Sequence, residues 1–556
     1  MMGKFNIVIF FTALIFLNCN KKSGGNNPPP PPPSNFSMLS WSVNGKPSQL
    51  VYYDISKTPL VQLKFSTVID RASTAGSIAL KENSGATVNY TLSYANGDSA
   101  VIITPGQPLN NLAKYRVSVS TQLKSVSGGS LNSSTEITFI TSIDSTRKFP
   151  VITDDSLLTL VQKQTFKYFW DFAHPVSGLA RERNTSGDLV TSGGSGFGIM
   201  TIITAIHRGF ITRSQGLTRL QTIVSFLKNT AQKFHGAFPH WLNGTTGVVI
   251  PFSANDNGAD LVETSYLIQG LLIARQYFNG GDASETSLRS DINVIWNNVE
   301  WSWFRQNNQN VLYWHWSPTN NWVMNHQIRG WNECLITYVL AASSTTFSIP
   351  QVVYTQGWAG GTGFINGNFY YGYQLPLGPP YGGPLFFEHY SFLGIKPPGL
   401  SDAYANYQVQ TVNHTKINYE YCKANPLGYF GYSDSVWGLT ASDIENGYTA
   451  SSPTNDVGVI APTAAISSLP YTPIESMKAL KFFYYVLGDK IWGEYGFKDA
   501  FSLHKLWFAN SYLAIDQGPI IVMIENHRSG LLWNLFISCP EVKAGLLSLG
   551  FSAPYL

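Results

Sequence analysis

Two hydrophobic periodicities divide this chain. Between about residues 36 and 145, short runs in which Val, Ile, Thr and Tyr alternate with polar residues are separated by turn sequences such as Asn96-Gly97-Asp98 and Gly128-Gly129. This spacing is typical of short strands packed as an all-β sandwich. After Phe149-Pro150, apolar residues recur at helical spacing up to the C-terminus. We therefore expect a small all-β domain followed by a mainly α domain.

The helical part predicts about ten helices, joined by long loops rich in Gly, Trp, Tyr and Asn. Long loops in a compact domain are typical of a binding surface. Antiparallel succession without a fixed-period repeat favours a ring of helical hairpins, an (α/α)6 barrel, over a simple helical repeat. The expected helices are 155–172, 198–209, 213–234, 260–278, 285–298, 331–343, 401–422, 473–487, 519–526 and 541–549.

The helix expected at 260–278 carries acids where a buried helix seldom has them. Its apolar residues spread over most of the circumference, which predicts burial on nearly all sides. Asp260 and Glu263 share one face at its N-terminal end, where the helix dipole partly offsets negative charge. An unpaired charge inside a core is costly, so we expect this end to open into a polar cleft. The alternative is that Asp260 caps the helix and Glu263 forms a salt bridge with an Arg.

Composition narrows the possible ligands. Charged residues make up 12% of the chain, the formal net charge is +3, and Lys and Arg are scattered along it. A nucleic-acid or acidic-membrane partner is therefore disfavoured. Aromatic residues reach 14%, with 15 Trp and 29 Tyr. Many amphipathic rings with little charge favour neutral, polar ligands such as sugars, whose C–H faces stack on rings.

The N-terminus is typical of an exported chain. Lys4 precedes an apolar run at 5–17, which is too short to span a bilayer comfortably, and Cys19 follows it. The segment resembles a bacterial lipoprotein signal. The resemblance implies that Cys19 becomes the first mature residue and carries acyl chains that anchor the protein in the bacterial cell envelope, facing the periplasm or the cell surface. The alternative is an ordinary secretory signal.

The linker that follows contains six consecutive prolines, Pro28 to Pro33. Polyproline is stiff, so this linker would hold the folded part away from a membrane. The β-sandwich resembles the bacterial Ig-like modules that often precede carbohydrate-active domains; we expect a spacer or packing partner, with independent sugar binding as the alternative. The expected segments are a signal peptide at 1–19, the Pro-rich linker at 20–35, the Ig-like sandwich at 36–146 and the helical domain at 147–556.

Cysteine and histidine spacing predicts neither a metal nor a cofactor. After Cys19 the chain keeps Cys334, Cys422 and Cys539, which permit at most one disulfide. The chain contains no HExxH sequence and no paired Cys/His spacing. The Gly-rich stretch at 193–198 lacks the Lys-Ser/Thr ending of a phosphate loop and follows no expected strand. A monomer is expected.

Nine stretches of the helical part carry a resemblance to a known family. They are SGLARERN, GGSGFGIMTIITAIHRGFITR, HGAFPHWLNGTTG, NGADLVETSYLIQGLL, YWHWSPTNNWVMNHQIRGWNECL, FFEHYSFLGIKPPGL, WGLTASD, IAPTAAISSLPYTP and YLAIDQGPIIVMIENHRSGLLW. From about Asp155 to the C-terminus, the chain resembles the glucoamylase-like domain of the β-1,2-glucanases, glycoside hydrolase family 144. The resemblance implies an (α/α)6 barrel and inverting hydrolysis of linear β-1,2-glucan, to sophorose or longer oligosaccharides, without a metal or cofactor. After WGLTASD the chain reads Ile444-Glu445-Asn446-Gly447, which departs from the family pattern, so the subsite shape is expected to differ there.

The resemblance also implies that Asp260, Glu263 and Glu333 are the candidate catalytic acids. Inverting hydrolysis needs a carboxylic acid to protonate the leaving oxygen and a carboxylate to activate water, roughly 6.5–9.5 Å apart. Glu333 follows a Trp-rich loop, and aromatic burial raises the pKa of a carboxyl group, so we expect Glu333 to be the acid. Asp260 or Glu263 would then be the base, directly or through a substrate hydroxyl.

Other loop residues are candidates for sugar binding. Asp443 is open to three interpretations: a substrate hydrogen bond, a loop cap or a share in base catalysis. His240 and His389 could bind sugar hydroxyls or be structural, Glu182 is expected to pair with Arg181, and Asp516 and Glu525 are possible further lining residues. The expected binding residues are Arg181, His240, Trp314, Trp316, Trp331, His389, Tyr390, Trp437, Thr440 and Asp443.

Two other functions fit the same residues. One is a non-catalytic glycan-binding lipoprotein that kept the fold and lost turnover, although retention of all three acids argues against it. The other is a related hydrolase or phosphorylase of another β-glucan. The sequence leaves endo and exo action open, because that choice depends on whether loops block one end of the cleft.

Overall fold

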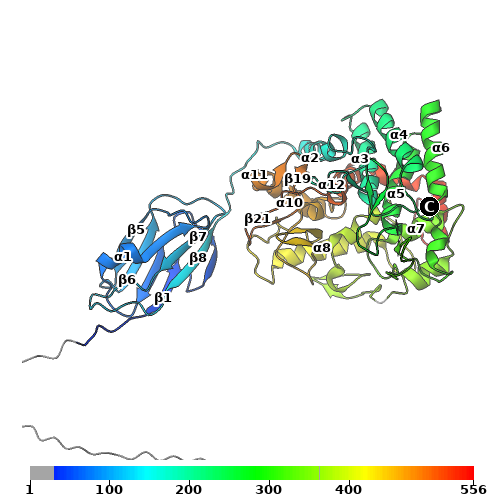
Figure 1. The fold of residues 1–556 in the computed structure, drawn as a ribbon. Helices are drawn as coiled ribbons and strands as arrows, with labels where there is room; N and C mark the ends of the chain where they lie inside the picture. The colour runs from blue at the N-terminus through cyan, green and yellow to red at the C-terminus, as the bar shows by residue number, and fades with distance from the viewer. Residues whose placement is uncertain (1–30, 362) are drawn as a thin grey trace, which may run out of the picture. The chain divides into compact units, whose positions relative to one another are not determined.

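The computed structural model describes residues 31–361 and 363–556, which form two units. The strand-rich unit, blue in Figure 1, extends to Leu109 and includes Tyr115–Phe139. The helical unit comprises Asn110–Lys114 and Ile140–Leu556. The predicted signal at 1–19 with Cys19, and the predicted linker as far as residue 30, lie outside the described residues.

The strand-rich unit contains two four-stranded sheets with the orders β1-β3-β6-β5 and β2-β8-β7-β4. Alternate residues of β3 are buried, as predicted for strands with one face on a core. Val43, Leu63, Ile103 and Phe139 are fully buried between the sheets. The strands are β1 (Met38–Val43), β2 (Val51–Ile55), β3 (Val61–Phe65), β4 (Ile78–Glu82), β5 (Tyr90–Ala95), β6 (Ala100–Pro105), β7 (Lys114–Val119) and β8 (Thr135–Thr141), with one short helix, α1 (Arg71–Ser77).

The second unit is mainly α, as predicted. Among the helices at 31–361 and 363–556, none combines the length and hydropathy needed to cross a membrane. Its helices are α2 (Asp154–Trp170), α3 (Ser192–His207), α4 (Arg213–Asn229), α5 (Leu261–Tyr277), α6 (Ala283–Asn297), α7 (Leu335–Ser343), α8 (Tyr407–Ala424), α9 (Pro462–Ile466), α10 (Pro473–Tyr485), α11 (Gly488–Ile491), α12 (Ala514–Ser529), α13 (Leu531–Ile537) and α14 (Pro540–Ser548).

Short strand pairs stiffen the loops between these helices. The pair β12–β13 brings His315 opposite Asp260 and so ties the Trp-rich loop to the start of α5. The strands are β9 (Leu189–Thr191), β10 (Trp241–Asn243), β11 (Val249–Ile250), β12 (Ala259–Asp260), β13 (His315–Trp316), β14 (Phe369–Tyr370), β15 (Tyr373–Gln374), β16 (Ala441–Ile444), β17 (Gly447–Ala450), β18 (Trp492–Gly493), β19 (Gly496–Phe497), β20 (Phe501–Ser502) and β21 (Trp507–Phe508).

Helices α3, α5 and α12 form the centre of the helical unit. In each of them nearly every residue of the first three turns is buried, and α3 packs against both α5 and α12. The contact between α3 and α5 is glycine to glycine, because a Cβ atom at Gly270 would lie 2.2 Å from the carbonyl oxygen of Gly196. The two helices can therefore approach closely only because neither residue has a side chain.

Several helix boundaries differ from the predicted ones. Helix α3 begins at Ser192, six residues before the predicted start, because the Gly-rich stretch at 193–198 is helical. Helix α7 begins only at Leu335, so Glu333 lies in the turn before the helix. The short helices α9, α11 and α13 were not predicted, because four to seven residues are too few to show a period.

Candidate active site

A cavity of about 470 Å³ opens at the N-terminal ends of α3 and α5 and beside the loop that precedes α7. The β16–β17 hairpin and the residues around the start of α12 complete its wall. Five predicted site residues line it: Glu263, Glu333, His240, Trp314 and Tyr390. The other lining residues are Glu182, Arg183, Thr191, Trp241, Phe252, Tyr266, Phe386, Ala441, Tyr448, Ala450, Leu513 and Ile515.

Glu333 is held by its backbone, while its carboxyl group faces the cavity. The carbonyl oxygen of Glu333 accepts a hydrogen bond of 2.5 Å from Ser391 Oγ. Burial raises the pKa of the Glu333 carboxyl to about 7, with a smaller contribution from the charges of Glu263 and Asp260. Within the described residues, no cation pairs with this carboxyl. Near neutral pH, Glu333 is therefore poised to hold and release a proton.

Glu263 projects from the first turn of α5 into the same cavity. Its Oε2 accepts hydrogen bonds from the backbone N–H of Gly193, at 2.7 Å, and from Thr191 Oγ1, at 3.3 Å. Burial raises the pKa of Glu263, although the charge of His240 acts in the opposite direction. The partners of Glu263 are the start of α3 and His240, so the alternative of a salt bridge with an Arg is wrong.

Asp260 is the N-cap of α5, which confirms the capping role that the alternative interpretation gave it. Its Oδ1 accepts hydrogen bonds from the backbone N–H groups of Val262 and Glu263, and its Oδ2 lies 3.1 Å from His240 Nδ1. Burial raises the pKa of Asp260, but the bond from His240 and the charges of His315 and His240 outweigh burial and lower it. Asp260 does not line the cavity, and both of its oxygens are engaged, one by the start of α5 and the other by His240.

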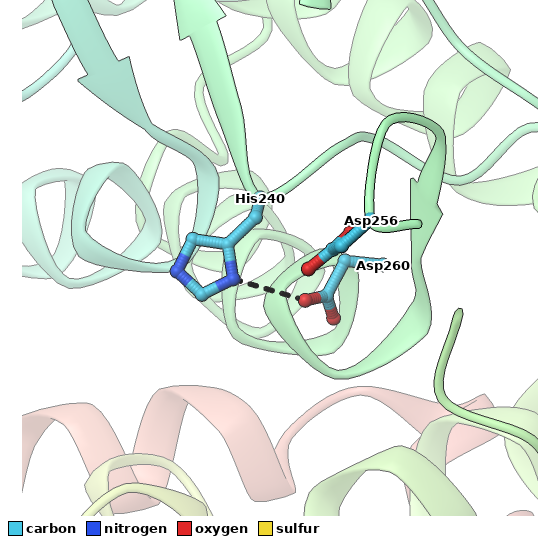
Figure 2. Close-up of side chains that lie close together, drawn as sticks. All are labelled: His240, Asp256 and Asp260. Carbon is cyan, nitrogen blue, oxygen red and sulfur yellow. Dashed lines mark hydrogen bonds and ion pairs between the residues drawn. The ribbon is translucent and has the colours of Figure 1, made fainter. Parts of the chain in front are cut away.

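A cluster of imidazoles and carboxylates forms around Asp260. Figure 2 shows the imidazole of His240 facing the carboxylates of Asp256 and Asp260. His315 Nε2 lies 3.6 Å from Asp256 Oδ2 and 3.7 Å from Asp260 Oδ2. Burial lowers the pKa of His240, but the charges of Glu263, Asp260 and Asp256 prevail and raise it to about 9. Burial also raises the pKa of Asp256 to about 7, with Asp260 adding to the effect.

The same cluster is spaced for a cation. One ligand atom each from His240, Asp256 and Asp260 lies within 4.8 Å of the others. Among the residues that the structure describes, no other group of three His, Cys, Asp or Glu side chains has this spacing. Imidazole nitrogen with carboxylate oxygens suits zinc and similar ions. This group leaves no signal in the sequence, because its members are separated along the chain and do not form a known spacing. When His240 is protonated, its imidazolium supplies to the two carboxylates the positive charge that a bound cation would otherwise supply.

The charge of His240 leads to a testable effect of pH on stability. Its pKa is raised above 6.5 in the folded state, so this contribution to stability is fully present below pH 6.5 and is lost as the pH rises through about 9. We expect His240→Gln to remove this pH dependence, whereas His207→Gln, on a side chain that is 40% exposed, should leave it. Urea unfolding at pH 6 and pH 9.5 measures the difference. Equal pH dependence in the wild type and His240→Gln would contradict the assignment.

A second group of charges, which includes Glu182 and Arg183, lies along the cavity wall. Arg183 pairs with Glu182 at 2.9 Å and with Asp443 at 3.2 Å, and Ser511 Oγ donates to Asp443 at 2.5 Å. Glu182 therefore pairs with Arg183 and not with Arg181. Asp443 does not line the cavity, and its carboxylate is engaged by Arg183 and Ser511. The sequence SGLARERN indicated the right loop, but no signal in it distinguishes one arginine from the other.

Two buried carboxyl groups lie behind this wall. The backbone N–H of Asp443 donates to Asp499 Oδ2 at 2.7 Å. Burial raises the pKa of Asp499 to about 7, and it raises that of Asp516, at the start of α12, well above its usual value. The negative charge of Asp499 raises the pKa of Asp516 further, so at least one proton remains on this pair near neutral pH. Glu525, by contrast, is paired with Arg208 and does not line the cavity.

The structure places three predicted binding residues in other contacts. Arg181 donates to the carbonyl oxygens of Gly187 and Phe172, so its guanidinium is directed at the backbone. Trp316 packs against the rings of His235 and Trp303. Buried Trp331 donates from Nε1 to Glu388 at 3.1 Å. None of the three lines the cavity, because each is used to hold the loops that surround it.

Three further predicted residues are part of the interior. His389 Nε2 is bonded to Ser468 Oγ at 3.0 Å, and burial lowers the pKa of His389 to about 3, which keeps it neutral. Trp437 is fully buried. Thr440 Oγ1 accepts a hydrogen bond from the backbone N–H of Phe386 at 3.0 Å. None of these three residues lines the cavity, and their position in loops did not reveal their burial.

Comparison with known proteins identifies both units. The family model described as "Putative glucoamylase" matches residues 325–540, and that of the bacterial Ig-like domain matches residues 53–141. The exo β-1,2-glucooligosaccharide sophorohydrolase (non-reducing end) of Parabacteroides distasonis is 48% identical over 418 residues, 71% of this chain. The match spans 58% of the length of that relative.

Solved structures extend the similarity to the fold. The endo-β-1,2-glucanase of Chitinophaga pinensis, solved with sophorotriose and glucose, is 53% identical; the match covers 73% of this chain and 100% of that one, with a TM-score of 0.71. The β-1,2-glucanase of Parabacteroides distasonis is 38% identical over 93% of this chain and 73% of that one, with a TM-score of 0.71. The chain therefore belongs to the glucoamylase-like family that includes these β-1,2-glucanases.

Proposed function

We propose that this protein is a glycoside hydrolase that cleaves linear β-1,2-glucan with inversion, releasing sophorose or longer β-1,2-gluco-oligosaccharides. The observation that carries the proposal is the meeting of two carboxyl groups from separate segments, Glu333 and Glu263, in one cavity lined by indole and phenol rings. The relatives named above act on β-1,2-linked glucans, which supports the choice of linkage. We also propose that the helices close into an (α/α)6 barrel with α3, α5 and α12 in its inner ring.

In the proposed mechanism, Glu333 is the general acid. Its buried carboxyl group holds a proton near neutral pH and gives it to the glycosidic oxygen as the bond to the anomeric carbon breaks. Glu263 is the base that takes a proton from the attacking water, because it faces the cavity while Asp260 is fixed as a helix cap. The imidazolium of His240 favours the ionised form of Glu263.

Asp516 is the competing base, because it lies close enough to the cavity for its charge to act on Tyr390, together with those of Glu333 and Glu263. Parallel Glu263→Gln and Asp516→Asn variants decide between the two. We expect the loss of the base to lower kcat by about 10²–10⁴-fold. If one of the two substitutions lowers kcat less and changes mainly KM, the residue that it replaces positions the substrate and is not the base.

The substrate is tested by the release of reducing ends from linear β-1,2-glucan, compared with β-1,3- and β-1,4-glucans. We expect hydrolysis of the β-1,2-glucan alone, and sizing of the products over time separates endo from exo action. Hydrolysis of another β-glucan in preference, or phosphate-dependent release, would replace the proposed activity. Binding without turnover would make the protein a glycan-binding lipoprotein.

The proposed acid also fixes the expected pH profile. Because Glu333 must be protonated to act, kcat/KM should fall as the pH rises through about 7. Rates on β-1,2-glucan between pH 5 and 9 give the position of this alkaline limb. A rate that stays constant up to pH 9 would exclude Glu333 as the proton donor.

We further propose that the protein is lipid-anchored through Cys19 in the bacterial cell envelope, on the strength of the N-terminal sequence pattern. Growth with a labelled fatty acid should label the wild type and not Cys19→Ala. Fractionation should place that variant among the soluble proteins. Equal labelling of the two would exclude lipidation at this residue.

A further inference from the structure

Helix α7 begins without a capping side chain of its own. Cys334 stands at its N-cap position and makes no side-chain hydrogen bond to the first turn. The first backbone N–H groups of a helix have no partner within the helix, so they need an acceptor from outside it. Glu333, the proposed general acid, is the residue before this N-cap. The group that satisfies the start of α7 therefore lies next to the residue that carries the proton.

Ser391 supplies the missing acceptor from a distant part of the chain. Its Oγ accepts a hydrogen bond of 3.0 Å from the backbone N–H of Ile336, in the first turn of α7. The same hydroxyl group donates to the carbonyl oxygen of Glu333. A hydroxyl group has one donor and two acceptor positions, so one Oγ can make both bonds. Ser391 is buried, and the two backbone groups depend on this hydroxyl group because bulk water does not reach it.

The backbone of Ser391 is tied to α5. Gln269, a fully buried residue of α5, donates from Nε2 to the carbonyl oxygen of Ser391 at 2.9 Å. Ser391 also begins the short 3₁₀ helix Ser391–Leu393, which restricts its backbone. The helix that carries Glu263 and the turn that carries Glu333 are therefore both hydrogen-bonded to one residue.

The direction of the Glu333 backbone affects its carboxyl group. Burial raises the pKa of Glu333, and the backbone N–H of the same residue lowers it. The second effect depends on where that N–H points, because a hydrogen bond weakens steeply as its angle closes. The bond from Ser391 Oγ to the Glu333 carbonyl oxygen restrains this backbone. Loss of the hydroxyl group should therefore change the carboxyl group as well as the turn.

We propose that Ser391 is a positioning residue of the active site, which sets the orientation of Glu333 and its separation from Glu263 through one hydroxyl and one carbonyl group. The inference rests on the proposed function, in which these two carboxyl groups act as acid and base. Such a pair must be held at a defined separation, roughly 6.5–9.5 Å in inverting enzymes. A misplacement of about 1 Å can lower a rate by about 100-fold.

The test compares Ser391→Ala with Ser343→Ala. Ser343 is the last residue of α7, is buried, and donates from Oγ to the carbonyl oxygen of Val339 at 2.7 Å. Each substitution removes one buried hydroxyl group that donates to a backbone carbonyl oxygen, but only Ser391 is bonded to Glu333. We expect Ser391→Ala to lower kcat on β-1,2-glucan by about 10- to 100-fold with KM little changed, and Ser343→Ala to leave both unchanged.

The pH profile separates positioning from a general loss of stability. In Ser391→Ala the Glu333 N–H is no longer held against its own carboxyl group, so we expect the pKa of Glu333 to rise. The alkaline limb of kcat/KM should then move from about pH 7 to higher pH, while Ser343→Ala keeps the wild-type limb. An unmoved limb in Ser391→Ala, or equal losses of kcat in the two variants, would overturn the proposal.

Gln269→Met tests the link from the side of α5. It removes the donor to the Ser391 carbonyl oxygen and keeps the Ser391 hydroxyl group. We expect a smaller loss of kcat, about 3- to 10-fold, without a shift of the alkaline limb, because Glu333 keeps its partner. A wild-type kcat in this variant would overturn the part of the proposal that concerns the separation of Glu333 from Glu263.

A direct titration of Glu333 tests the inference without hydrolysis. NMR of the isotope-labelled carboxyl carbons follows the protonation of Glu333, and the absence of its signal in Glu333→Gln assigns it. We expect the midpoint to shift in Ser391→Ala and to stay at the wild-type value in Ser343→Ala. A wild-type protein that cleaves no β-glucan would disprove the proposed function, and this titration would still decide the role of Ser391. Equal midpoints in the wild type and Ser391→Ala would overturn that role.

Discussion

Replacement of Glu333 by Gln is expected to lower kcat on β-1,2-glucan by about 10²–10⁴-fold, the usual contribution of general acid catalysis. Gln keeps the size of the side chain but has no proton to give to the leaving oxygen. The Glu333 carbonyl oxygen, which accepts from Ser391 Oγ, is unaffected, so the turn before α7 should keep its shape. Initial rates of reducing-end release measure the loss.

The matched control is Glu445→Gln, an exposed acid at the tip of the β16–β17 hairpin. It removes the same charge and should leave the rate within about twofold. Binding of an oligosaccharide to Glu333→Gln should persist, because the rings that line the cavity are intact. A Glu333→Gln protein that is as active as Glu445→Gln would remove Glu333 from the mechanism.

Gly270→Ala is expected to cause the largest loss of stability of the substitutions considered. The new Cβ would lie 2.2 Å from the carbonyl oxygen of Gly196, and since that atom belongs to the backbone, the helices must move apart. Overpacking of this kind costs typically about 1–3 kcal/mol, occasionally more, and the better helix propensity of Ala returns about 1 kcal/mol. Because the clash is with a backbone atom that cannot rotate away, we expect a cost at the upper end of this range, and therefore a net loss of about 2 kcal/mol in the free energy of unfolding, measured in urea.

Gly281→Ala is the control, because a Cβ at that exposed glycine meets no atom within 4 Å. It should change the free energy of unfolding by less than about 0.5 kcal/mol. Gly270→Ala should also lower activity, because separation of α3 from α5 pulls the Gly193 N–H away from Glu263. Equal stability of the two variants would show that the helices tolerate separation.

The fold could be predicted wherever a period is long enough to be seen. The sequence of helix α5 shows apolar side chains on every face, which predicts the burial that the structure shows for fourteen consecutive residues. In a helix predicted to be buried, the two acids at its start are unusual and therefore indicate a site. Helix α3 was predicted short because glycines lower helix propensity. In the structure, those glycines are the contact surface for α5, and this tertiary role leaves no local signal.

The site could be predicted only in part. Acids at the ends of apolar helices indicated Glu263 and Glu333, since a charge there needs a cleft. The position of an aromatic residue in a loop did not show whether it faces the cavity, as for Trp314, or the core, as for Trp437. Tyr448 was missed because it reaches the wall through the pairing of β16 with β17, and pairing across a turn brings it beside Asp443.

The β16–β17 hairpin has a consequence for how such proteins diverge. Its strands supply Ala441, Tyr448 and Ala450 to the wall, while its tip at Glu445 and Asn446 is exposed. Insertions at an exposed tip leave the packed interior untouched. A longer tip would therefore alter the surroundings of the cavity and leave Glu263 and Glu333 unchanged.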